Sequence, residues 1–236
     1  MEIYALQVNH LSNPLGYALG KGKLSFSWKV KDAKGKSQTY ARVRIAADEA
    51  MQEILFDSGE DREANSLGYK IDFKTKPRTR YFWTLELASD AGEVTVSVPQ
   101  FFETAKMDEA WTGRWITCAT DQARHPYFVK DIAAQEEVVR ARLYVCGLGL
   151  YEAYWDDKKI GNEYLTPYQN NYNRWVQYQT YDVTEQVKDG GKLRILLGNG
   201  WYGGRFGFSA HEEKGYFGNT HKLIAEVLVT YAHGTE

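Results

Sequence analysis

The chain has 236 residues, of which 43% are hydrophobic and 25% charged, as in ordinary folded globular proteins. Its 29 Lys and Arg nearly balance 31 Asp and Glu, for a net charge of −2, so neither nucleic acid nor an anionic membrane is an expected partner. Aromatic residues make up 14% of the chain and there are 21 glycines, which favours an all-β protein with many tight turns.

The N-terminal residues have neither the basic region nor the apolar segment of a signal peptide, and no stretch approaches the ~20 apolar residues of a membrane span. We therefore expect a soluble chain, cytoplasmic by default, and periplasmic or secreted if a leader has been removed.

The first hundred residues alternate between apolar and polar side chains as half-buried strands do. In residues 40–46, for example, Ala41, Val43 and Ile45 share one face. Further strands are expected at 24–30, 54–56, 80–88 and 93–98. This rhythm predicts an immunoglobulin-like or fibronectin type III sandwich, with Trp28 in its core and Tyr81 as a tyrosine-corner residue.

A polar segment, 104–110, predicts a domain boundary after Lys106, giving domains 1–106 and 107–236. The second half resumes the short strands, expected at 115–118, 127–129, 138–147, 175–183, 193–197 and 223–231. No apolar helical spacing extends over twelve positions, so long helices are not expected. The predicted architecture is two β-sandwiches in tandem.

The sequence holds none of the zinc-protease, nucleophile-elbow or phosphate-loop motifs. His211 and His221 lie ten residues apart, a weak metal signal, and surface or hydrogen-bonded core histidines are expected instead. Cys118 and Cys146 lie in apolar strand-like runs and are expected to be buried free thiols, although a disulfide between facing strands is left open. Glycoside hydrolysis needs two carboxylates across the sugar, and no pair is singled out, so no catalytic residue is predicted.

The most distinctive segment is the turn 198–208, in which five glycines surround aromatic residues. Flat aromatic faces suit the apolar face of a sugar ring, and nearby polar side chains can bond its hydroxyls. The candidate carbohydrate-binding residues are Asn199, Trp201, Tyr202 and Arg205. The alternative is that Trp201 and Phe206 close one end of the sandwich.

A second polar group, Asp156 and Asp157, lies at the tip of an expected hairpin. Neighbouring oxygen ligands can hold calcium, which makes Ca²⁺ the candidate cofactor and these two residues its candidate ligands. The alternative is a solvated turn.

Longer strings of the sequence resemble a known family. The first half contains NPLGYALGKGKLSFSWKV and TRYFWTLELASDAGEV, and the second contains GLGLYEAYW, YQTYDVT and LGNGWYGGRFGF. In this order and spacing the chain resembles, over nearly its whole length, the N-terminal region of bacterial α-L-rhamnosidases of glycoside hydrolase family 78.

The resemblance implies a fibronectin-like sandwich followed by a jelly-roll-like accessory domain that ends incomplete at residue 236. It also implies a catalytic (α/α)6 barrel elsewhere in the polypeptide, so the general acid and base have no counterpart here and turnover by these residues alone is not expected. The jelly roll resembles a module that in some members binds L-rhamnose with calcium. The family's usual Asn-Gly at the hairpin is replaced by Asp156 and Asp157, and a sugar-binding role is carried over only to the turn at Asn199–Arg205.

Three functions follow as hypotheses. The chain is an accessory region that binds a rhamnose-containing carbohydrate, or a purely architectural support for the catalytic domain of the same polypeptide, or a protein-interaction module. The architectural hypothesis predicts that Trp201 is largely buried.

Overall fold

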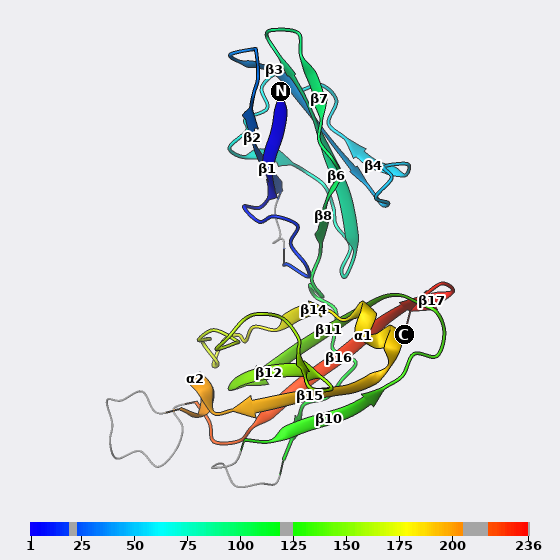
Figure 1. Ribbon diagram of the computed structural model, residues 1–236. Coiled ribbons are helices and arrows are strands. Elements are labelled where there is room, and N and C mark those ends of the chain that lie inside the picture. Colours follow the sequence, from blue (N-terminus) through cyan, green and yellow to red (C-terminus); the bar gives the residue numbers. More distant parts are fainter. Residues whose placement is uncertain (19–22, 119–124, 205–216, 236) are drawn as a thin grey trace. The chain divides into compact units, whose positions relative to one another are not determined.

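The computed structural model describes residues 1–18, 23–118, 125–204 and 217–235. The chain divides into two compact units, Met1–Ala110 and Trp111–Glu236, each built of antiparallel strands (Figure 1). The expected boundary after Lys106 lies a few residues before this division. Within the described ranges no helix is long and apolar enough to cross a membrane. The prediction of an all-β protein with tandem sandwiches is confirmed.

The first unit contains two sheets. The smaller has the order β1-β2-β5, with bounds Glu2–Val8, Leu24–Lys31 and Tyr69–Ile71. The larger has the order β4-β3-β6-β7, with β8 also pairing β6, and its strands are Ile54–Asp57, Gln38–Ala46, Arg80–Ser89, Val94–Val96 and Gln100–Glu103. Phe26 of β2 packs edge-on against Trp83 of β6, with ring centroids 4.7 Å apart. This contact joins the two sheets across the core.

Alternation explains the strands that were predicted. Ala41, Val43 and Ile45 are fully buried. Trp28 is buried in the core, and Tyr81 is buried with its hydroxyl accepting the Lys76 amide at 2.8 Å, as a tyrosine corner requires. Strands β1 and β5 were not expected.

The second unit also contains two sheets. One has the order β10-β15-β12-β13, with bounds Tyr127–Ile132, Gly191–Gly198, Leu150–Trp155 and Lys158–Lys159. The other has the order β14-β11-β16-β17, with β9 also pairing β16, and its strands are Gln179–Asp182, Val138–Leu148, Lys222–Tyr231, Gly234–Thr235 and Ile116–Thr117. The core between these sheets includes Leu143, Val145, Ile195 and Leu197.

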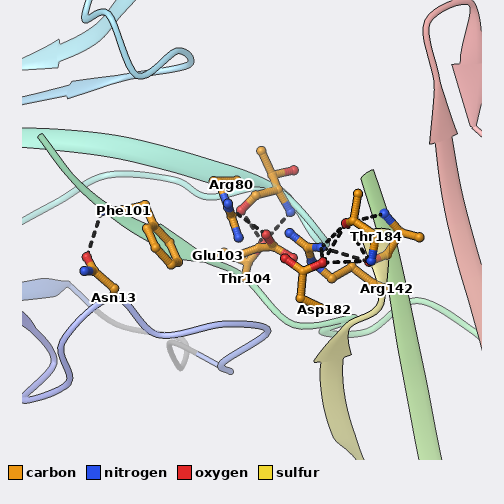
Figure 2. A network of polar contacts seen from close by, with 10 residues as sticks. Asn13, Arg80, Phe101, Glu103, Thr104, Arg142, Asp182 and Thr184 are labelled. Carbon is orange, nitrogen blue, oxygen red and sulfur yellow. Dashed lines mark hydrogen bonds and ion pairs between the residues drawn. The ribbon is translucent and has the colours of Figure 1, made fainter. Parts of the chain in front are cut away.

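In the described part of the second unit, two short helices follow strands: α1, Thr184–Asp189, and α2, Gly200–Gly203. Hydrogen bonds around the buried side chain of Arg142, in β11, connect this strand to the residues where α1 begins. The Arg142 guanidinium donates to Asp182 Oδ1 and to the Ala141 carbonyl, both at 2.8 Å. Thr184 Oγ1 accepts the Ala141 amide at 3.0 Å, and Figure 2 shows Arg142, Asp182 and Thr184 together.

The strand expected from Trp175 begins only at Gln179. The residues before it are irregular, and Tyr178 lies with its ring centroid 6.3 Å from that of Tyr144. Tyr144 and Cys146 alternate with the core residues of β11 but are themselves buried, so the outer face of this strand is covered too, with Tyr178 against Tyr144.

Neither Cys118 nor Cys146 forms a disulfide bond, in line with the prediction of two thiols. Cys146 is buried, and burial raises the pKa of its thiol to about 12. Cys118 is only half-buried, so the prediction of full burial is wrong for this residue.

Candidate functional site

The predicted aromatic turn leaves β15 and forms helix α2. Gly200 has a φ of +45°, a left-handed conformation in which glycine avoids strain. A Cβ at Gly200 would collide with the Leu150 backbone, and one at Gly149 would collide with the Gly198 carbonyl. These glycines therefore let the start of β12 and the end of β15 approach closely, and this contact positions α2.

The two aromatic residues of α2, Trp201 and Tyr202, differ in how much they are buried. Trp201 is 36% exposed. Tyr202 is half-buried and packs edge-on against Tyr172, with ring centroids 5.3 Å apart. The Phe217 amide donates to the Tyr202 carbonyl at 3.1 Å, and the Phe217 ring lies 5.0 Å from that of Tyr172. Tyr202 thus anchors the turn, and Trp201 is presented at the surface.

Asn199 precedes α2, and its carbonyl accepts the Gly203 amide at 2.8 Å. Its side chain makes no capping hydrogen bond to α2. Asn199, Trp201 and Tyr202 therefore lie together as the sequence predicts, whereas Arg205 lies outside the described residues.

The contact between this turn and the aromatic segment before β14 was not predicted from the sequence. Asn170 is buried, and its Oδ1 accepts the Gln177 amide at 3.2 Å. The Trp175 amide donates to the Asn171 carbonyl at 2.9 Å. Inside this closed loop Tyr172 contacts Tyr202, and burial raises the pKa of the Tyr172 phenol. The density of Tyr and Trp in residues 164–175 was the available signal.

His221 departs from the expectation for core histidines. It is buried, and within the described part of the chain neither ring nitrogen has a hydrogen-bond partner. Its ring centroid lies 6.2 Å from that of His125. Burial, and secondly the proximity of His125, lower the pKa of His221. His211 lies outside the described residues.

Asp156 and Asp157 join β12 and β13, as the hairpin prediction requires. Asp156 Oδ1 accepts the Lys192 amide at 2.9 Å, and Asp157 Oδ1 accepts Arg194 Nη1 at 2.9 Å. Both carboxylates thus bond to donors of β15, next to two cationic side chains. They line a surface hollow of about 440 Å³ with residues Tyr127, Val129, Tyr154, Lys192 and Arg194.

This arrangement does not fit a calcium ion, which takes six to eight oxygen ligands. In the ranges that the structure describes, no three His, Cys, Asp or Glu side chains gather as metal ligands. Calcium at Asp156 and Asp157 stays a prediction without support from the geometry.

The fold defines the protein as a pair of β-sandwiches whose second member carries an aromatic turn at one end. Residues 3–108 match the model of the Rha78A-like N-terminal immunoglobulin domain, and residues 136–236 match that of the α-L-rhamnosidase N-terminal domain. The chain thus belongs to the α-L-rhamnosidase family and corresponds to its N-terminal region.

Curated relatives are similar in sequence to much of the chain. An α-L-rhamnosidase of Formosa agariphila is 31% identical over 230 residues, covering 83% of this chain and 24% of that protein. One from Streptomyces avermitilis is 38% identical over 139 residues, covering 56% of this chain and 13% of that protein. The chain therefore spans about a quarter or less of the length of these relatives.

Solved structures show the same fold. The α-L-rhamnosidase of Dictyoglumus thermophilum superposes with a TM-score of 0.80 at 28% identity, covering all of this chain and 28% of that one. The Streptomyces avermitilis enzyme, solved with L-rhamnose, has a TM-score of 0.82 at 18% identity, covering 99% of this chain and 40% of that one. At that identity the likeness concerns the fold alone.

Proposed function

We propose that this chain is the accessory, substrate-binding region of an enzyme that hydrolyses terminal α-L-rhamnosides, and that its second unit binds L-rhamnose at the turn Asn199–Tyr202. The hydrolysis itself is assigned to a catalytic domain elsewhere in the same polypeptide. The family supports the substrate class, and the side chains of the turn support the place of binding.

The observation that carries the proposal is the exposure of Trp201. The residue is 36% exposed, which is more than a fully buried plug at the end of a sandwich would show. The inner neighbour Tyr202 is packed against Tyr172, so Trp201 is held on an anchored support. An exposed indole on a fixed turn, beside the Asn199 amide, suits the apolar face and hydroxyls of a sugar.

An architectural role is the second candidate, and a different feature favours it. An apolar hollow of about 480 Å³ opens between the sheets of the second unit, lined by side chains that include Ile116, Phe128, Leu193, Leu223 and Val227. Such a surface suits packing against further polypeptide of the same protein.

Calorimetric titration of the 236-residue chain with L-rhamnose tests the proposal. We expect saturable binding that weakens about ten-fold or more in Trp201→Ala, since a stacked aromatic ring contributes on the order of one power of ten in affinity. The matched control is Trp115→Ala, which removes a tryptophan that is 46% exposed and lies before β9. Circular dichroism checks that both variants are folded.

Binding that survives Trp201→Ala would refute the site, and a folded chain that binds no L-rhamnose would favour the architectural role. Repeating the titration in EDTA tests the calcium prediction separately, because chelation abolishes binding only if a metal holds the sugar.

A further inference from the structure

The loop before β14 presents large aromatic side chains at the surface. Tyr168 is 69% exposed and Trp175 is 53% exposed. Exposing two such rings forgoes the favourable burial of apolar area. Neither ring belongs to the core of the second unit, so packing inside this unit does not account for them.

Hydrogen bonds close this loop on itself, and one of its aromatic rings packs against the candidate sugar site. The Asn170 side chain closes it by accepting the Gln177 amide at 3.2 Å, and the Asn171 carbonyl accepts the Trp175 amide at 2.9 Å. Tyr172, between the two exposed rings in the sequence, packs 5.3 Å from Tyr202 of α2. Figure 1 shows this yellow-green segment beside α2 at one end of the unit.

We propose that Tyr168 and Trp175 form a second sugar subsite next to Trp201, so that the second unit binds a chain of at least two sugar rings. This inference rests on the proposed function, because the first ring is the L-rhamnose assigned to Trp201. The ligand class is therefore a rhamnose-containing oligosaccharide or polysaccharide.

The chemistry of sugars supports a second aromatic surface. Each ring of an oligosaccharide offers an apolar face, and aromatic side chains held in advance bind such faces without losing further conformational entropy. Two subsites on one rigid unit bind linked sugars more tightly than a single sugar, because the second contact is intramolecular.

The experiment compares L-rhamnose with a tetrasaccharide of α-linked L-rhamnose by calorimetry on the 236-residue chain. We expect the tetrasaccharide to bind about ten-fold more tightly. Trp175→Ala and Tyr168→Ala should remove that gain and leave the affinity for L-rhamnose unchanged, whereas Trp201→Ala should weaken both ligands. Trp115→Ala is again the matched control, since this tryptophan is 46% exposed before β9 and lies outside both aromatic segments.

The inference is overturned if both ligands bind with equal affinity, or if the gain survives in Trp175→Ala and Tyr168→Ala. Failure of the proposed function looks different, since L-rhamnose then does not bind or binds independently of Trp201. If only the tetrasaccharide binds, loss of that binding in Trp175→Ala supports the second subsite. Tetrasaccharide binding that persists in Trp175→Ala refutes the second subsite.

Discussion

The imidazole of His221 is buried beside the ring of His125, and the described residues offer neither of its nitrogens a hydrogen bond. Protonation in the folded state would place a charge in an apolar environment next to a second imidazole. Burial and His125 therefore lower the pKa of His221 below its ordinary value of 6.5.

We expect this histidine to make the protein sensitive to acid. Below about pH 6.5 the unfolded chain binds a proton that the folded chain does not, so the free energy of unfolding falls as the pH drops. The loss stops once the pH is below the folded pKa. Urea unfolding at pH 7.5 and 5.5 should show a smaller loss in His221→Leu than in the parent.

The matched variant is His233→Gln, at an exposed histidine, which should keep the pH dependence of the parent. If His221→Leu loses as much stability in acid as the parent does, the burial of a neutral imidazole is not the cause.

At the scale of elements, the polar cluster around Arg142 connects three segments of the second unit. The buried guanidinium bonds to Asp182 at the end of β14, and Thr184 at the start of α1 bonds back to Ala141 of β11. Because the carboxylate of Asp182 is half-exposed, solvent screens part of this interaction.

Arg142→Met should lower the free energy of unfolding by about 1–3 kcal/mol, because it removes the buried hydrogen bond to the Ala141 carbonyl and the ion pair with Asp182. The Val183 amide still donates to the Ala141 carbonyl and the Thr184 hydroxyl to Asp182, so the loss stays moderate. Urea denaturation measures the change. The comparison variant is Lys188→Met, which removes the exposed ion pair with Glu185 at 2.8 Å and should cost about 0.5 kcal/mol or less. Equal losses in the two variants would contradict a structural role for Arg142.

At the scale of the whole molecule, each unit has a hydrophobic core of its own. Leu85 belongs to the core of the first unit and Ile195 to that of the second. Both side chains are almost fully buried. Separate cores allow separate cooperative unfolding.

Calorimetric unfolding should therefore show that Leu85→Ala and Ile195→Ala destabilise different transitions, each by about 3 kcal/mol from the cavity left behind. Leu85→Ala should leave the transition of the second unit in place, and Ile195→Ala the reverse. A single transition that moves equally in both variants would show that the two units unfold together.

The strands with a period of two were predictable because one buried face selects apolar side chains at every second residue. This holds for Ala41, Val43 and Ile45, and for Trp28 and Tyr81. Short elements such as β5 and α1 were missed, because so few residues carry no readable period. The segment 175–178 was misassigned because its aromatic residues resemble a strand, whereas Trp175 is exposed and Tyr178 packs against Tyr144 on the outer face of β11.

For the candidate site, too, some features follow from the sequence and others only from the tertiary structure. The sequence by itself determined the class of fold, the family, and the turn that places Asn199, Trp201 and Tyr202 together, because neighbours in the chain remain neighbours in space. Only the tertiary structure decided that Trp201 is exposed while Tyr202 is an anchor, and that Tyr172 fastens a distant loop to α2. It likewise decided that Asp156 and Asp157 bond to β15. Such contacts depend on which strands pair and which faces they bury, and residues far apart in the sequence meet only when the sheets have formed.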